Sequence, residues 1–204
     1  IQAGYPNGDF FIARPLSDST LRQRFEAPAN AAFMADHVDT AADGGRRLTR
    51  LFFDDARREI ARNTAVKTEY DPRVRGWYTD AVEKDGLVLT EPYLFYFMRM
   101  AGLTLAREVG DSGVVVASDV TLDRLSETIR RYQVTPDTEI VMFSRDGHAL
   151  AYPDTGKLLQ SANGDELNMA RLSGLGSPVL SFLAKDLNPA AQSLNFEFDG
   201  RSWK

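Results

Sequence analysis

The chain has 204 residues, of which 43% are hydrophobic and 26% charged, a composition typical of a folded globular protein. Its formal net charge of −5 argues against a protein that attracts nucleic acid electrostatically. The absence of cysteine excludes disulfides, zinc–thiolate sites and cysteine nucleophiles. No apolar run approaches the roughly 20 residues that a membrane-spanning helix needs. Because the chain starts at Ile1 without an initiator methionine, we expect a soluble piece of a longer protein, and any membrane anchor would lie outside this piece.

The first third of the chain reads as antiparallel hairpins. Turn residues at 5–9 separate two apolar stretches, which predicts that strands 1–4 and 10–13 pair with each other. Residues 31–38 are apolar enough for a strand, with a short helix as the alternative. A second hairpin is expected from two further extended stretches, 48–53 and 59–64. Nearby arginines, with acidic residues interspersed, are interpreted as a solvated surface in preference to a phosphate-binding patch: Arg46, Arg47, Arg50, Arg57, Arg58 and Arg62.

A helix is expected to begin at Asp71-Pro72, with Asp71 as N-cap and proline where its missing N–H does no harm. It should end near Lys84. Extended segments then follow at 94–98, 103–109 and 114–120. A further helix is expected over 122–130, with Thr121 or Asp119 as its cap.

The pattern then restarts with a second, smaller unit. We expect a hairpin of 139–143 and 148–152, an extended segment at 167–172, a helix at 179–184 and a strand at 193–198. The helix near 121–131 would join two sheet-and-helix units in series. No regular strand–helix alternation is present, so the sequence predicts an α+β fold with antiparallel sheets.

Motifs for catalysis, metal binding and cofactors are missing from the sequence. The two histidines, His37 and His148, are far apart and have no cysteine partner, which argues against a metal site or a histidine-based triad. No phosphate loop, dinucleotide fingerprint or calcium-loop spacing occurs. We therefore expect a binding module without catalytic residues, metal or cofactor.

The beginning of the helix near residue 72 carries a candidate anion site. On a helix Arg75 and Tyr78 would share a face, with Trp77 on the adjoining one. An arginine in the first turn would lie near free backbone N–H groups, and its guanidinium could bind a carboxylate with two hydrogen bonds. The alternative is that the rings belong to the core and that Arg73 or Arg75 pairs with Asp71.

Two later segments could add to this site. On a strand Tyr93, Phe95 and Phe97 would share one face, where Tyr93 could offer a hydroxyl and Phe95 an apolar wall. For Phe97 a core position is favoured. Asp119 ends an apolar strand and must be paired, hydrogen-bonded or exposed, because burying it alone is costly. It is either a helix cap or a ligand contact.

These residues carry a family resemblance. Tyr70, Arg75, Trp77, Tyr78 and Tyr93, followed by GVVVASDVTLDRLS, resemble the double Cache extracytoplasmic sensor domains of bacterial transmembrane receptors. The resemblance implies two tandem PAS-like units: residues 1–130, membrane-distal and ligand-binding, and residues 131–204, membrane-proximal and truncated. The long helix that precedes such units is absent here. It also implies a periplasmic domain of an inner-membrane protein, and a homodimer is compatible with it.

The resemblance further implies how a ligand is held. In family members that sense amino acids, the positions of Arg75, Trp77 and Tyr78 hold the carboxylate, those of Tyr70 and Tyr93 support it, and that of Asp119 receives the ammonium. Those members have an acidic residue where this chain has Phe95. We therefore expect an organic acid, or an amino-acid-like ligand, with one apolar end.

The segments GYPNGDFFIARPL and PYLFYFMRMAGLTLAR look similar to sensor regions attached to class III adenylate or guanylate cyclases. Two other interpretations are open. The chain could be a structural or interaction module of a receptor without a small ligand. Less favoured is a small hydrolase that uses Asp119 or Glu91 as general base.

Overall fold

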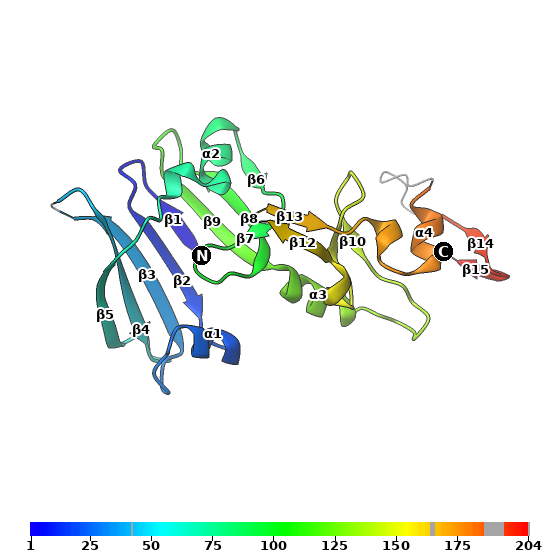
Figure 1. Ribbon diagram of the computed structural model, residues 1–204, viewed down its shortest axis with the longest axis horizontal. Coiled ribbons are helices and arrows are strands. Elements are labelled where there is room, and N and C mark those ends of the chain that lie inside the picture. Colours follow the sequence, from blue (N-terminus) through cyan, green and yellow to red (C-terminus); the bar gives the residue numbers. More distant parts are fainter. Residues whose placement is uncertain (42, 164–165, 186–193, 204) are drawn as a thin grey trace. The chain divides into compact units, whose positions relative to one another are not determined.

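The computed structural model describes residues 1–41, 43–163, 166–185 and 194–203. Its main feature is a nine-stranded sheet in the order β5-β4-β3-β2-β1-β9-β8-β6, with β7 beside β8 (Figure 1). All of its paired strands are antiparallel, which confirms the predicted α+β class. The strands are β1 (Gln2–Gly4), β2 (Phe10–Pro15), β3 (Phe33–Thr40), β4 (Arg46–Phe53), β5 (Glu59–Lys67), β6 (Leu87–Leu89), β7 (Tyr93–Leu94), β8 (Ala101–Glu108) and β9 (Val115–Thr121).

The chain forms two compact units. Unit 1 comprises Ile1–Glu91, Tyr96–Met98 and Leu103–Asp119; unit 2 comprises Pro92–Phe95, Arg99–Gly102 and Val120–Lys204. The functional division into residues 1–130 and 131–204 stays a prediction. Among the described residues, no helix combines the length and the hydrophobicity required to cross a bilayer.

Both hairpins expected in the first third of the chain are confirmed. Strand β1 pairs with β2, and β4 pairs with β5. Residues 31–38 lie mostly in β3, so the strand interpretation was right and the helix alternative wrong. In β2 every second side chain is buried, namely Phe10, Ile12 and Arg14. We call this buried side of the unit 1 sheet its inner face.

Strand β1 lies between β2 and β9, and its glycine lets helix α2 (Gly76–Glu83) pack closely. A Cβ atom on Gly4 would lie 2.8 Å from Cη2 of Trp77 and 2.9 Å from Cδ2 of Tyr78. Both distances are shorter than a van der Waals contact, so a side chain at this position would push the two rings away. The glycine therefore places Trp77 and Tyr78 directly against the sheet.

The helix expected from residue 72 to 84 is interrupted, which corrects the prediction. Asp71 caps a short 3-10 turn, η1 (Pro72–Val74), by accepting a hydrogen bond from the Arg73 N–H. Arg75 is extended, with φ −97° and ψ 136°, and α2 starts only after it. Arg75 therefore precedes the helix and does not share a helical face with Tyr78.

The strand expected at 94–98 is also wrong. β7 has two residues, and the chain then turns: the Phe95 N–H donates to Met100 O, and the Arg99 N–H to Phe95 O. Arg99 has a φ of +53°, a left-handed conformation that is uncommon for a residue other than glycine. Residues 93, 95 and 97 therefore do not share a strand face.

A short helix that the sequence analysis missed is α1 (Ser19–Arg24), capped by Asp18. It leads into a cluster of buried apolar side chains in unit 1: Leu16, Phe25, Ala31, Met34 and Phe52. The Arg22 guanidinium stabilises the segments on both sides of α1 by donating hydrogen bonds to the carbonyl oxygens of Leu16, Ala31, Pro28 and Ala29.

Unit 2 contains the predicted helices and a set of small hairpins. Thr121 caps α3 (Leu122–Arg130), and Ser177 caps α4 (Pro178–Leu183). The first hairpin pairs β10 (Met142–Phe143) with β11 (Ala149–Ala151), as expected. The strand predicted at 193–198 begins at β14 (Phe196–Phe198), and Ser193 lies outside the described residues. The remaining elements are η2 (Thr155–Lys157), β12 (Leu159–Asn163), β13 (Glu166–Met169), η3 (Leu172–Gly174) and β15 (Arg201–Trp203).

We predict that Gly102→Ala destabilises the protein. An added Cβ would lie 2.3 Å from Cζ of Phe95 and 2.5 Å from the backbone oxygen of Val120, which cannot rotate away. Overpacking of this kind costs about 1–3 kcal/mol, measurable by urea denaturation.

Gly76→Ala is the matched control. Nothing lies within 4 Å of its added Cβ, and Gly76 starts α2, so alanine should raise the free energy of unfolding by about 0.4–1 kcal/mol. Equal effects of the two substitutions would contradict the close packing of Phe95 on Gly102.

Candidate functional site

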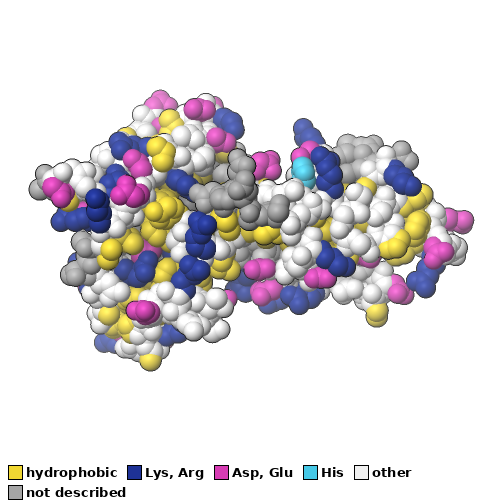
Figure 2. All heavy atoms as spheres, viewed as in Figure 1, with side chains coloured by type: hydrophobic (Ala, Val, Ile, Leu, Met, Phe, Trp, Pro, Cys, Tyr) yellow, Lys and Arg dark blue, Asp and Glu magenta, His cyan; other side chains and the backbone are white. Residues whose placement is uncertain are grey.

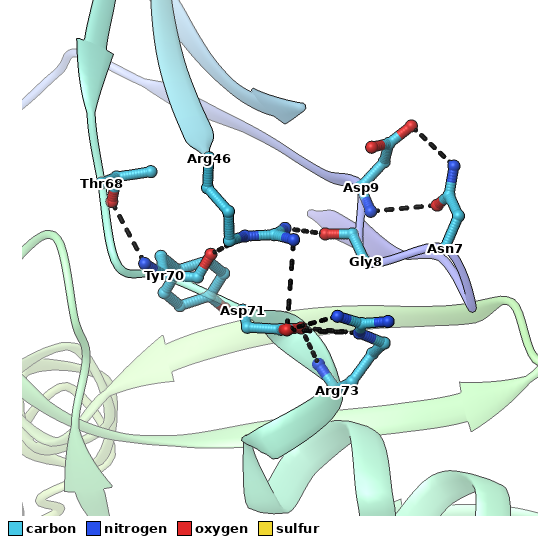
Figure 3. Close-up of polar contacts among 8 residues, drawn as sticks. All are labelled: Asn7, Gly8, Asp9, Arg46, Thr68, Tyr70, Asp71 and Arg73. Carbon is cyan, nitrogen blue, oxygen red and sulfur yellow. Dashed lines mark hydrogen bonds and ion pairs between the residues drawn. The ribbon is translucent and has the colours of Figure 1, made fainter. Parts of the chain in front are cut away.

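A polar network in unit 1 fixes the segment just before Arg75 (Figure 3). Arg46, on β4, donates from Nε to Tyr70 O at 2.6 Å and from Nη2 to Gly8 O, and its Nη1 lies 4.0 Å from the Asp71 carboxylate. Arg73 also pairs with Asp71, with Nη2 to Oδ2 at 2.7 Å. The hydrogen bond from Arg73 is the main reason that the pKa of Asp71 lies below its usual value.

Two of the arginines interpreted as solvated surface are in fact largely covered. The side chains of Arg46 and Arg50 are only 15% and 19% exposed, whereas that of Arg47 is 48% exposed. Strand alternation explains the difference, because Arg46 and Arg50 point to one side of β4 and Arg47 to the other. The surface interpretation therefore holds for Arg47 and is wrong for Arg46 and Arg50.

An aromatic cluster surrounds Tyr70 and Trp77 in unit 1. The Phe10 ring lies 4.6 Å from that of Tyr70 and 6.2 Å from that of Trp77, measured between centroids. Tyr96 and Phe97 flank Tyr70 at 5.0 and 4.9 Å. Tyr70 and Trp77 are both buried. The cluster forms an apolar environment in which a charge-assisted hydrogen bond would be strong.

Arg75 and Tyr78 lie next to this cluster. Arg75 is partly buried, and its guanidinium carbon is 5.9 Å from the centroid of the Tyr96 ring, a cation–π distance. The Tyr78 hydroxyl donates to Gly113 O, and its pKa is raised, mainly by burial. The structure thus brings Tyr70, Arg75, Trp77 and Tyr78 together in one unit; we call these four residues the candidate anion site.

Tyr93 and Phe95 belong to unit 2 and contact each other there. Their rings meet edge to face, with centroids 5.2 Å apart. Phe95 is buried and packs over the backbone of Gly102. In the described structure Phe95 therefore has a packing role within unit 2.

Asp119 is held as a hydrogen-bond acceptor in unit 1 and does not cap a helix, because Thr121 caps α3. Its Oδ1 accepts from Gln2 Nε2 at 2.9 Å and from Thr104 Oγ1 at 2.6 Å. Gln2 pairs with Ile12 on one side and Ala117 on the other, so strand alternation places Asp119 on the inner face. Burial raises the pKa of Asp119 above its ordinary value.

An ion-pair cluster on the inner face was not predicted from the sequence. Asp36, fully buried on β3, accepts from Arg50 Nε at 2.7 Å and from Arg50 Nη2 at 3.2 Å. Arg14 Nη2 lies 3.5 Å from the same carboxylate. The Phe25 ring covers both guanidiniums, at 4.4 Å from Arg50 and 5.3 Å from Arg14. The alternation of FFIARP, with Arg14 in phase with Phe10 and Ile12, was the signal that could have revealed it.

The part of the chain that the structure describes contains no group of three His, Cys, Asp or Glu side chains placed to hold a metal. On the face shown in Figure 2, basic and acidic side chains are interspersed.

Comparisons with known proteins find an adenylate cyclase and methyl-accepting chemotaxis proteins among the relatives of this chain. Adenylate cyclase 1 of Rhizobium meliloti (strain 1021) is 28% identical over 157 residues, 76% of this chain and 24% of that protein. The methyl-accepting chemotaxis protein McpB of Bacillus subtilis (strain 168) is 41% identical over 121 residues, 58% of this chain and 18% of that protein. The chain thus spans a quarter or less of the length of these curated relatives. No protein-family model matches it.

Two chemoreceptor domains are among the solved structures that align with this chain. The ligand-binding domain of Campylobacter jejuni Tlp3, in complex with L-valine, aligns with a TM-score of 0.44 and 16% identity, covering 82% of this chain and 58% of that one. The ligand-binding domain of Pseudomonas fluorescens CtaA, also with L-valine, aligns with a TM-score of 0.41 and 24% identity, covering 62% and 54%.

Asp119→Asn tests the buried carboxylate. A carboxyl whose pKa is raised in the folded state costs stability once it ionises, so its contribution to the free energy of unfolding falls as pH rises from 3.8 through the raised pKa. Asparagine keeps an oxygen for Gln2 and Thr104 but does not ionise. The variant should therefore gain stability relative to the wild type over this pH range.

Urea denaturation of both proteins at a series of pH values measures this difference. The difference in free energy of unfolding between variant and wild type should grow as pH rises. A difference that stays constant or becomes smaller would show that Asp119 is not held in a desolvated position.

Proposed function

We propose that this chain, a double Cache sensor domain by its motifs and its curated relatives, is the extracytoplasmic sensing region of a membrane receptor and binds a small carboxylate-containing ligand. The curated relatives, chemotaxis receptors and an adenylate cyclase, confirm the resemblance noted from the sequence. They also agree with a sensor role and not a catalytic role for this piece. The output of the whole protein, a cyclase or a chemoreceptor-type signal, is part of the proposal.

The observation that carries the proposal is the position of an arginine beside three aromatic rings, close to Gly4 of the sheet. The partly buried Arg75 guanidinium lies at the Tyr96 ring, whose centroid is 5.0 Å from that of Tyr70, and Trp77 is buried two residues further along the chain. A guanidinium can bind both oxygens of a carboxylate, and the surrounding rings would strengthen these bonds by limiting the access of water. This supports Arg75 as the group that binds the ligand carboxylate.

Asp119 supports a second polar contact in the same unit. Its carboxylate is held by Gln2 and Thr104 through one oxygen, Oδ1, and it is not required as a helix cap. An ammonium or hydroxyl group of a ligand could donate to it. The ligand class that fits is a small organic acid or an amino-acid-like molecule.

Signalling adds one requirement. A ligand shifts a conformational equilibrium only if it binds one state more tightly than the other. In the proposed receptor, segments beyond these 204 residues would anchor the domain in the membrane and carry that change onward.

A structural module without a small ligand is the second candidate, and one observation favours it. Trp77 is only 2% exposed and packs against Gly4. The Tyr78 hydroxyl already donates a hydrogen bond to Gly113 O. Both side chains therefore contribute to the core, whatever else they do.

Arg75→Gln distinguishes the two candidates. Ligands are first sought by thermal shift with a panel of L-amino acids and carboxylic acids. For a ligand present at 100 times its Kd, the wild type gains about 2.7 kcal/mol. Loss of a buried charge partner costs about 2–5 kcal/mol of binding, so the variant should lose most of the shift.

Arg73→Gln is the control, because Arg73 is exposed and pairs with Asp71 two residues before Arg75. It should keep the wild-type ligand response. If no compound in the panel stabilises the wild type, and Arg75→Gln changes only the melting temperature, the structural module is the better description.

A further inference from the structure

Arg14 is the least satisfied charged side chain on the inner face of unit 1. It is 8% exposed, and among the described residues its Nε and Nη1 are buried and have no hydrogen-bond partner. A buried N–H group without an acceptor costs free energy comparable to a lost hydrogen bond, and more when the group is charged. Such a guanidinium is expected to have an acceptor in the functional state of the protein.

Arg14 and Arg50 share one carboxylate. The guanidiniums of both residues lie within ion-pair distance of Asp36. Arg50 binds both oxygens of Asp36, at 2.7 and 3.2 Å, while Arg14 approaches with one nitrogen at 3.5 Å. Arg50 is therefore the main partner of the Asp36 carboxylate, and Arg14 is the more weakly paired of the two arginines.

Arg14 lies on the same side of the sheet as the candidate anion site. It shares a face of β2 with Phe10, which contacts Tyr70 and Trp77. Phe10 and Arg14 are four residues apart on β2, so their Cα atoms are about 13 Å apart. An extended Arg14 side chain shortens the distance between its guanidinium and the candidate anion site. Asp119 and Tyr70 also lie within electrostatic range of its guanidinium.

We propose that Arg14 binds a second acidic group of the ligand, so that the site takes short dicarboxylates in preference to monocarboxylates of the same length. This rests on the proposed function, with Arg75 at one end of the ligand. Arg14 would be at the other end, where its two buried N–H groups gain an anionic acceptor. The expected apolar end of the ligand, inferred from Phe95, is thereby replaced by an acidic one.

Isothermal titration calorimetry on this chain tests the proposal without any variant. The probes are succinate and glutarate, compared with butyrate and valerate, which have the same chain lengths and one carboxylate fewer. We expect the dicarboxylates to bind at least about 30-fold more tightly, since a buried charge pair is worth about that much or more. Equal affinities would overturn the proposal and would mean that water satisfies the Arg14 N–H groups.

Arg14→Met tests whether Arg14 is the residue that causes the preference for dicarboxylates. Methionine keeps an unbranched side chain beside Phe25, and Asp36 keeps Arg50. The dicarboxylate affinity should fall at least about 30-fold, while that for the monocarboxylates changes less than about threefold. The melting temperature without ligand should stay the same or rise, because two unsatisfied N–H groups are removed. A purely structural Arg14 predicts the opposite: a lower melting temperature and unchanged selectivity.

Two further variants complete the experiment. Arg47→Met, on the opposite side of β4, is the matched control and should bind like the wild type. Arg14→Lys keeps the charge but loses the two-pronged geometry, and should retain part of the selectivity. If Arg75→Gln abolishes carboxylate binding and Arg14→Met does not alter selectivity, only this inference fails. If no carboxylate binds the wild type, the proposed function fails with it.

Discussion

The buried carboxylate of Asp36 is the constraint on which unit 1 depends. A carboxylate without solvent access must be paired, and Asp36 is paired by Arg50 on the adjacent strand. A one-residue slip between β3 and β4 would turn one of the two side chains to the outer face and break this pair. The ion pair therefore favours one register strongly, and the same register aligns the apolar side chains of the inner face.

The candidate anion site is built on this sheet through a glycine and an arginine. Gly4 leaves room for Trp77, and Arg46 connects β4 to the carbonyls of Gly8 and Tyr70. These contacts fix the chain on both sides of Arg75, whose extended backbone then directs its side chain independently of helix α2. The position of the key guanidinium thus depends on long-range contacts and not on helix periodicity.

The features that the sequence predicted are those set by neighbouring residues: the two early hairpins, strand β9 and the capped helix α3. The break at Arg75 was not predictable from periodicity, because residues 72–84 read as one helix beginning at a capped proline. The turn after Phe95 uses Arg99 at positive φ, with no glycine to mark it. The partners of Arg14 come from other strands, and only the pairing register brings them together.

Two of the charged groups on the inner face, Asp119 and Arg14, give the proposed receptor a physical basis for response. Burial costs free energy at both Asp119 and Arg14, and the protein compensates each only in part: Asp119 through Gln2 and Thr104, Arg14 through Asp36. A ligand that supplies the missing partner removes that cost in the conformation it binds and not in others. Such a difference in affinity is what a sensor needs to shift its conformational equilibrium. On this view the incomplete satisfaction of Arg14, which would be a defect in a purely structural domain, is the source of the binding energy for the signal.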